Sequence, residues 1–275
     1  MKVEFTIKGA ENKPMLVDLK AKNKRAPLII FVHGFKGFKD WGTFNLLANE
    51  FAKAGFCFVK LNLSHNGTTP EQPIDFADLD AFGNNNYSKE LHDIGKVLDF
   101  LQEENEYSEW YNFENLTLMG HSRGGGVTLL KAAQDNRIKK VITLAALLDL
   151  GRTVNPPNKE TWEKEGVIYI PNARTNQQMP LYWQFRLDYL QNFEALSIEL
   201  NAEKITQPTL IIHGEQDEAV EVEQAYRLKD LIPDVQLEII SETGHTFNAK
   251  HPWVENELPE KSKEFVALAI NFLNS

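Results

Sequence analysis

Short apolar runs, each long enough for one buried strand, recur along the chain and alternate with helical patterns. The run 27–32 (PLIIFV) is continuously apolar and ends at His33-Gly34. Strands of this composition are buried on both faces, as in parallel sheets that helices cover on both sides. The sequence therefore predicts an α/β fold with a mainly parallel eight-stranded sheet flanked by helices. The expected strands are 3–8, 15–20, 27–32, 56–61, 116–119, 141–146, 209–212 and 235–240.

Helical spacing fills the intervals between these runs. Apolar side chains recur every three or four residues over 44–51 and 91–101, and Ser88 is a candidate N-cap for the second helix. Pro259 is expected to open a last helix, because proline is favoured in a first turn. Strands that alternate with helices in this way are joined by right-handed crossovers.

One stretch interrupts the alternation. Residues 151–201 separate two core strands by about 50 residues, far more than an ordinary crossover needs. Long ordered insertions are often lids or binding elements, although a packing cluster without a functional role is the alternative. We expect one domain, 1–275, in which 151–201 is a cap containing a strand at 166–170 and a helix through 187–196. Its aromatic residues either line an acyl pocket or form the cap's own core: Trp162, Tyr169, Tyr182, Trp183 and Phe185.

The charge of the chain excludes one class of partner. It carries 29 Lys and Arg against 39 Asp and Glu, a formal net charge of -10, whereas nucleic-acid binding needs clustered basic residues. No stretch approaches the ~20 apolar residues of a membrane span, and the N-terminal residues lack the apolar segment of a signal peptide. We expect a cytoplasmic protein without a nucleic-acid or membrane partner, whose oligomeric state stays open.

The strongest chemical signal is the segment Gly120-His121-Ser122-Arg123-Gly124, which follows the strand at 116–119 and precedes a helical stretch. In this context G-x-S-x-G forms a sharp turn, a nucleophile elbow, that exposes the serine hydroxyl. The glycines let neighbouring chain segments approach closely, although each in the first helical turn costs roughly 1 kcal/mol relative to alanine. That cost is understandable if close packing or access to Ser122 requires it.

A serine hydroxyl becomes a nucleophile only when a base takes its proton, and the base needs a partner that orients it. In enzymes with this elbow the chain order is serine, acid, histidine. Asp217 follows the strand at 209–212 and His245 follows the strand at 235–240. Both lie past the carboxyl ends of parallel strands, where open α/β sheets place their sites. The sequence therefore predicts Ser122, Asp217 and His245 as a catalytic triad.

The acid has rivals: Glu215 or Glu218 in the same loop, and Asp149 after the preceding strand. Among the seven histidines, His245 alone combines a post-strand loop, a preceding glycine and the right chain order. The histidines that end strands are expected to be structural, with backbone partners: His33, His121 and His213. The histidines lack the paired spacing of metal ligands, so we expect neither a metal nor another cofactor.

Acyl transfer also needs donors for the oxyanion of the tetrahedral intermediate. One is expected to be the backbone N–H of Arg123, the residue after the nucleophile, and the other comes from the loop after an early strand. The segment His33-Gly34-Phe35 occupies that loop, so we predict the backbone N–H of Phe35 as the second donor. The alternative is that His33-Gly34 is only a tight strand exit.

These motifs occur in the order found in the α/β-hydrolase superfamily, which the chain resembles along most of its length. The motifs are His33-Gly34-Phe35, Gly120-His121-Ser122-Arg123-Gly124, His213-Gly214-Glu215-Gln216-Asp217 and Gly244-His245. Within the superfamily, the chain is similar to small bacterial esterases, including those that cleave feruloyl and cinnamoyl esters. It is also similar to the catalytic domain of prolyl oligopeptidase-type peptidases. The resemblance implies the α/β-hydrolase fold and the triad roles but does not fix the substrate.

The sequence thus predicts a carboxylesterase-type serine hydrolase that cleaves a small-molecule ester through an acyl-enzyme on Ser122. A peptidase or amidase with the same triad is one alternative. A binding protein that keeps the fold without catalysis is the other, and the intact set of three residues argues against it.

Overall fold

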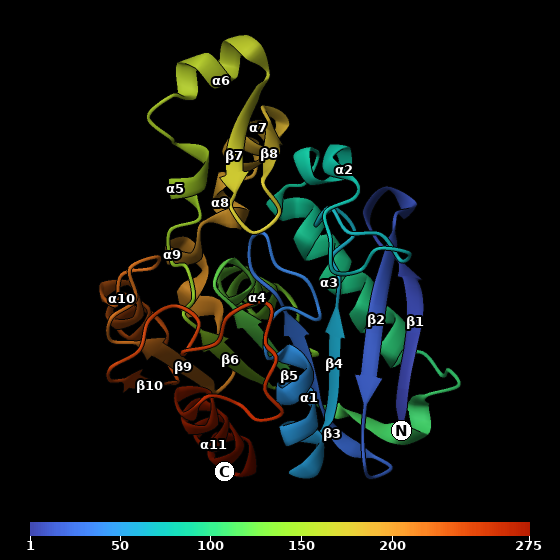
Figure 1. Cartoon of the computed structure of the whole chain (residues 1–275). Coiled ribbons are helices and arrows are strands. Elements are labelled where there is room, and N and C mark those ends of the chain that lie inside the picture. The colour runs from blue at the N-terminus through green and yellow to red at the C-terminus, as the bar shows by residue number, and fades with distance from the viewer.

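The computed structural model describes residues 1–275, and its main sheet has eight strands in the order β1-β2-β4-β3-β5-β6-β9-β10 (Figure 1). β1 and β4 each pair antiparallel with β2, and all other neighbours are parallel. This confirms the predicted sheet, because every expected segment is one of its strands. The strands are β1 (Lys2–Lys8), β2 (Pro14–Lys20), β3 (Ala26–Val32), β4 (Cys57–Leu61), β5 (Tyr111–His121), β6 (Lys140–Leu144), β9 (Thr209–Gly214) and β10 (Val235–Ile240).

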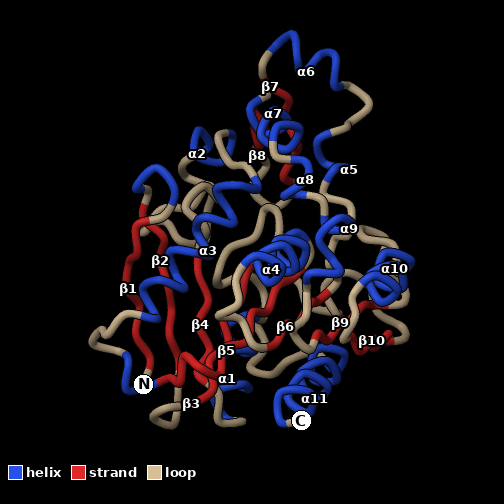
Figure 2. Tube along the Cα trace, turned by 180° about the vertical axis from the view of Figure 1, so that it is seen from behind, coloured by secondary structure: helices blue, strands red, loops and turns tan.

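Helices cover both faces of the sheet, as continuously apolar strands require. α1 (Phe44–Lys53) and α11 (Glu260–Asn274) pack on one face, while α3 (Tyr87–Gln102), α4 (Arg123–Gln134) and α10 (Glu223–Leu231) pack on the other. Figure 2 looks onto the face that carries α3 and α4. Along β3, Leu28 and Ile30 face that layer, whereas Ile29 and Phe31 face α1. Alternate side chains of one strand thus enter two separate cores.

The start of α3 differs from the prediction. Its N-cap is Asn86, whose side chain accepts a hydrogen bond from the Lys89 backbone N–H at 2.9 Å. The expected cap, Ser88, lies inside the first turn, and its own N–H donates to Asp188 at 3.2 Å. Asparagine and serine are about equally good caps, so the local sequence alone does not decide between them. Short elements complete this half of the chain: η1 (Ala10–Asn12), α2 (Leu79–Gly83) and η2 (Ser108–Trp110).

Residues 151–201 form a small substructure above the carboxyl edge of the sheet (Figure 1). β7 and β8 pair as an antiparallel hairpin whose tip points toward that edge. β7 contains most of the strand expected at 166–170, β8 was not anticipated, and the single helix expected through 187–196 is divided at Asn192. The elements are α5 (Gly151–Val154), α6 (Lys159–Glu165), β7 (Val167–Asn172), β8 (Gln177–Tyr182), α7 (Gln184–Gln191), α8 (Phe193–Leu196) and α9 (Ile198–Asn201), followed by η3 (Ala202–Lys204). No helix of the chain combines the length and apolar character needed to cross a bilayer.

Candidate active site

Ser122 lies at the junction of β5 and α4 in a backbone conformation that non-glycine residues rarely adopt, with φ 57° and ψ -122°. Neighbouring segments hold it there. Its N–H donates to the Leu144 carbonyl at 2.8 Å, and its own carbonyl accepts from Gly125 at 3.0 Å. Such strain persists only where the surrounding structure fixes it, and it is concentrated at functional sites.

The glycines around Ser122 are explained by close backbone contacts. A Cβ on Gly120 would lie 2.3 Å from the Gly124 carbonyl oxygen, and a Cβ on Gly124 would lie 2.4 Å from that of His33. No side chain fits at either position without moving the backbone. The turn therefore packs directly against the loop that follows β3.

The structure brings Ser122, His245 and Asp217 together. Ser122 Oγ lies 2.9 Å from His245 Nε2, and His245 Nδ1 lies 2.8 Å from Asp217 Oδ2. A carboxylate can only accept, so Nδ1 carries the proton and Nε2 is left to accept from the serine hydroxyl. The arrangement has the order nucleophile, base and orienting acid.

Asp217 is buried and anchored by several donors. Its Oδ1 accepts from the backbone N–H groups of Ala219 and Val220, both at 2.9 Å. Burial opposes ionisation, but hydrogen bonds from His213 and His245 hold the pKa of Asp217 well below its usual range. The carboxylate is therefore ionised across the neutral range.

The other acidic residues considered for the triad do not bond to the proposed catalytic histidine. Glu215 accepts from the Glu242 N–H at 3.4 Å, and Asp149 accepts from the Gly151 N–H at 2.8 Å. Neither these two nor Glu218 bonds to His245, whose Nδ1 contacts Asp217.

The three histidines expected to be structural each have a backbone carbonyl within hydrogen-bond distance. His33 Nδ1 lies 2.9 Å from the Gly34 oxygen, His121 Nε2 lies 2.8 Å from that of His245, and His213 Nε2 lies 2.8 Å from that of Val220. Burial lowers the pKa of His33 to about 4 and that of His121 to about 3, so both rings are neutral at pH 7. His213 has a second role that its sequence context does not reveal, because it also approaches Asp217 at 3.3 Å.

The loop after β3 passes beside the nucleophile. A Cβ on Gly34 would lie 2.9 Å from the Cβ of Ser122. The Gly34 carbonyl accepts from His33 Nδ1 at 2.9 Å and from the Gly37 N–H at 3.0 Å. These bonds fix the peptide plane, and hence the direction of the Phe35 N–H, which points opposite to the carbonyl in a trans peptide. The backbone N–H groups of Phe35 and Arg123 donate to no acceptor within the protein.

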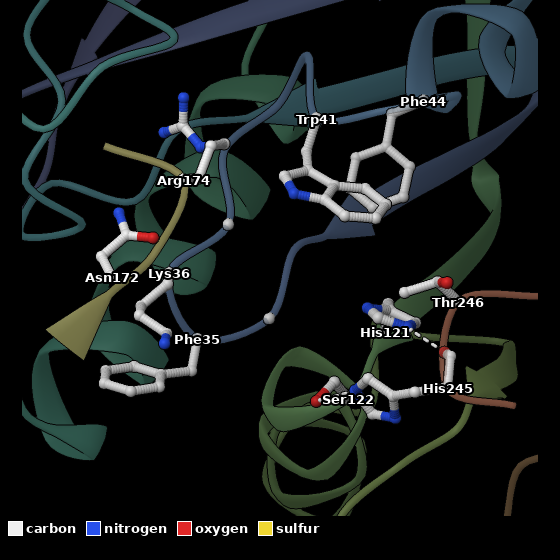
Figure 3. A pocket seen from close by; sticks show the side chains of 12 residues that line it. Phe35, Lys36, Trp41, Phe44, His121, Ser122, Asn172, Arg174, His245 and Thr246 are labelled. Atoms are coloured by element: carbon white, nitrogen blue, oxygen red, sulfur yellow. Dashed lines mark hydrogen bonds between the residues drawn. The ribbon is translucent and has the colours of Figure 1, made fainter. Parts of the chain in front are cut away.

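A cavity of about 220 Å³ opens beside Ser122 (Figure 3). Trp41 and Phe44 lie together on one wall, with ring centroids 5.7 Å apart. Asn172 and Arg174, from the tip of the β7–β8 hairpin, lie on the opposite side with Lys36. The twelve lining residues are Gly34, Phe35, Lys36, Gly37, Trp41, Phe44, His121, Ser122, Asn172, Arg174, His245 and Thr246. Arg174, like Arg186, was expected from the sequence only as a possible anchor for a peptide terminus, and of the two only Arg174 lines the cavity. Four lining residues were not expected from the sequence: Lys36, Trp41, Phe44 and Asn172.

The aromatic residues of 151–201 do not line this cavity. Trp162 is fully buried and packs edge-to-face on Trp183, with centroids 5.4 Å apart. The Tyr182 hydroxyl donates to Asp80 at 3.0 Å, and Tyr169 is 60% exposed. These aromatic residues thus pack within the segment and onto its neighbours. The alternative prediction, that they line an acyl pocket, is wrong.

The buried side chain of Arg123 connects three parts of the site. Its guanidinium carbon lies 4.0 Å from the Phe35 ring centroid and 5.2 Å from that of Phe185 in α7. One terminal nitrogen lies 3.5 Å from Glu90 Oε1 on α3. Burial raises the pKa of Glu90, and the positive charge of Arg123 opposes that rise. From the sequence, Arg123 was expected to contribute only its backbone N–H.

Known proteins resemble this chain in sequence. The sequence profile of the prolyl oligopeptidase family matches residues 43–269. The chain is 21% identical over 253 residues to 2-hydroxy-6-oxo-6-(2'-aminophenyl)hexa-2,4-dienoic acid hydrolase of Metapseudomonas resinovorans, covering 83% of this chain and 81% of that one.

Solved structures of the same fold include Est1E from Butyrivibrio proteoclasticus, with 18% identity, a TM-score of 0.72 and 99% coverage of both chains. Est1E has also been solved with bound ferulic acid. Another is the α/β hydrolase GrgF from Penicillium sp. sh18, with 16% identity, a TM-score of 0.74, and coverage of 100% of this chain and 98% of that one. These likenesses establish the fold, and the profile match places the chain among hydrolases. The chain is an α/β hydrolase and belongs to the prolyl oligopeptidase family.

Proposed function

We propose that this hydrolase cleaves carboxylic esters through a covalent acyl-enzyme on Ser122. The observation that carries the proposal is the continuous hydrogen-bonded series from Ser122 Oγ through His245 to Asp217, with distances of 2.9 and 2.8 Å. It lies at a cavity, and its nucleophile is in a strained turn at the carboxyl edge of a parallel sheet.

In the first half-reaction, Ser122 Oγ attacks the ester carbonyl carbon as His245 Nε2 takes the hydroxyl proton. Asp217 holds the imidazole in the required tautomer and stabilises the imidazolium. The carbonyl oxygen becomes an oxyanion that accepts from the N–H groups of Phe35 and Arg123, each worth roughly 3–4 kcal/mol when well placed. The His245 proton then passes to the departing alkoxide, and the acyl group remains on Ser122.

In the second half-reaction, a water molecule gives a proton to His245 and attacks the acyl-enzyme. Collapse of the second tetrahedral intermediate releases the acid and returns the proton to Ser122. No other group is needed for proton transfer, so these residues account for the complete cycle.

We propose that residues 151–201 act as a cap whose hairpin tip limits the length of the acyl group. Asn172 and Arg174 close one side of a cavity of about 220 Å³. That is smaller than the ≈ 300–1,000 Å³ of sites for drug-sized ligands, which favours a compact acyl group.

The experiment that tests the proposal is labelling with a fluorophosphonate probe, followed by mass spectrometry of the modified peptide. We expect one adduct on Ser122 in the native protein and none in Ser122→Ala. A folded protein without the adduct would favour the non-catalytic alternative.

Peptide-bond hydrolysis is the second candidate, because the matching family profile is that of prolyl oligopeptidases. An amine leaves only when it is protonated in line, so amide cleavage needs accurate placement against His245, usually through extended contacts. We expect kcat/KM to be higher for p-nitrophenyl acetate, p-nitrophenyl butyrate and a feruloyl ester than for aminoacyl and prolyl p-nitroanilides. Anilide turnover equal to ester turnover would favour the peptidase.

A further inference from the structure

The cavity beside Ser122 has a charge balance opposite to that of the whole chain. The chain has a formal net charge of -10, yet the lining includes Lys36 and Arg174 and contains no Asp or Glu. The lining residue His121 is neutral at pH 7, because burial lowers its pKa to about 3. A cavity lined by one sign of charge concentrates ligands of the other sign.

Lys36 is placed on the cavity wall at a conformational cost. Its φ of 54° lies in the left-handed region, which a side chain with a Cβ seldom occupies. Its ammonium group donates one hydrogen bond, to the Pro171 carbonyl at 3.3 Å, and lies 5.8 Å from the Phe35 ring centroid. A neutral carbonyl leaves the charge without a counter-ion, and burial lowers the pKa of Lys36.

Arg174 supplies a second positive charge at the outer rim. Its guanidinium approaches Asp75 and the Ile74 carbonyl, both at the long distance of 3.5 Å, and it faces the rings of Phe38 and Phe76. In Figure 3 the group is turned away from Ser122. These contacts occupy few of its five N–H donors, so it can still bind an anion at the rim.

The positions of the two cations relative to the triad indicate which part of an ester they would meet. His245 must protonate the leaving alcohol, so the alcohol lies on the side of His245 and Thr246. Lys36, Asn172 and Arg174 lie on the far side of the cavity from His245 (Figure 3). Lys36 also follows Phe35, the proposed oxyanion donor. The acyl group therefore extends toward the cations.

We propose that the site prefers esters whose acyl chain ends in a carboxylate, with Lys36 as the main anchor and Arg174 as a second charge at the rim. This inference rests on the esterase function proposed above. The competing explanation is that Lys36 only ties the loop after β3 to the cap through Pro171, which would give no preference for charge.

The test compares two esters with acyl chains of equal length, p-nitrophenyl hydrogen adipate and p-nitrophenyl hexanoate, which end in carboxylate and methyl. In the native enzyme, we expect a kcat/KM ratio of adipate to hexanoate at least about tenfold higher than in Lys36→Met, and a preference that weakens as salt is raised. Arg174→Gln should lower the ratio less, and Lys36→Glu should lower it most. The matched control is Lys164→Met, which removes a charge from the exposed outer end of the cap and should leave the ratio unchanged.

Calorimetric binding of both esters to Ser122→Ala separates this proposal from the esterase proposal. Tighter binding of the adipate ester, lost in the Lys36→Met double variant, supports the anionic site even if the native enzyme turns over neither ester. Equal affinity for the two esters, or a ratio that Lys36→Met and Arg174→Gln both leave unchanged, overturns it.

Discussion

Replacing Asp217 by asparagine tests the proposed triad at its least obvious member, and the structure indicates how the amide would sit. Oδ1 of Asp217 accepts from the N–H groups of Ala219 and Val220. An amide NH₂ cannot accept these bonds, so the oxygen of the introduced amide takes the Oδ1 position and its NH₂ faces His245 Nδ1. Two donors cannot face each other, and His245 must then carry its proton on Nε2.

The expected loss in kcat follows from that tautomer. With Nε2 protonated, His245 cannot take the proton of Ser122, although the distances between the residues barely change. The comparable asparagine substitution in the serine-protease template lowers kcat by about 10⁴, which corresponds to roughly 5 kcal/mol of transition-state stabilisation. We expect a loss of this order in kcat. The fold should persist, because the amide oxygen keeps both backbone bonds.

The assay is kcat and KM for p-nitrophenyl butyrate, with circular dichroism to confirm folding. Asp149→Asn is the matched control. Its carboxylate is exposed and accepts from the Gly151 N–H, a bond that an amide oxygen retains. We expect its kcat to stay within about twofold of the native value. A folded Asp217→Asn enzyme with more than a tenth of the native kcat would refute the tautomer argument. A larger loss of kcat in Asp149→Asn than in Asp217→Asn would assign the catalytic acid to the loop after β6.

Two further substitutions test charges that the structure pairs. Glu90→Gln leaves the Arg123 guanidinium buried without its counter-ion, so we expect urea unfolding to show a loss of about 3 kcal/mol, and an unchanged midpoint would contradict the pairing. Asp135 accepts two hydrogen bonds from the Arg137 guanidinium at 2.8 and 2.7 Å, which lower its pKa to about 2. A depressed carboxyl pKa stabilises the fold above the unfolded-state value near 4. The Asp135 side chain is largely buried, so Asp135→Asn should cost about 2 kcal/mol at pH 7, and the difference from the native protein should shrink between pH 4 and pH 2.

The sheet was predictable because the signals that define it are local. A continuously apolar run such as 27–32 fits a strand that is buried on both faces, and six such runs in alternation with helices leave few topologies. The positions of Ser122, Asp217 and His245 follow from the same logic, since each comes after a strand whose carboxyl end reaches one edge of the sheet. The structure then brings the three within hydrogen-bond distance.

The walls of the cavity were not predictable in this way. Arg174 lies in the turn of a hairpin whose second strand, β8, contains Pro180 and has no alternating apolar pattern. Lys36 enters the wall through a left-handed backbone position in a loop without a repeating pattern. Aromatic residues such as Trp162 were more conspicuous in the sequence, but large rings satisfy the packing of a small segment as readily as they line a pocket. The conspicuous aromatic residues of 151–201 are therefore not the ones that line the cavity, whereas the less conspicuous Asn172 and Arg174 of the same segment are.

The contacts of Arg123 join the proposed cap and the proposed oxyanion donors in one packing unit. Burying a guanidinium is costly, and here the compensation comes from Glu90 and from three aromatic rings, while its Nε has no partner in the protein. The rings belong to Phe35, to Tyr87 of α3 and to Phe185 of α7 within residues 151–201. The backbone N–H groups proposed to hold the oxyanion thus belong to two residues whose side chains touch, and the cap touches one of them directly. A shift of α7 cannot leave the Arg123 side chain unaffected, so residues 151–201, which contribute Asn172 and Arg174 to the cavity wall, also bear on the geometry in which the oxyanion would be held.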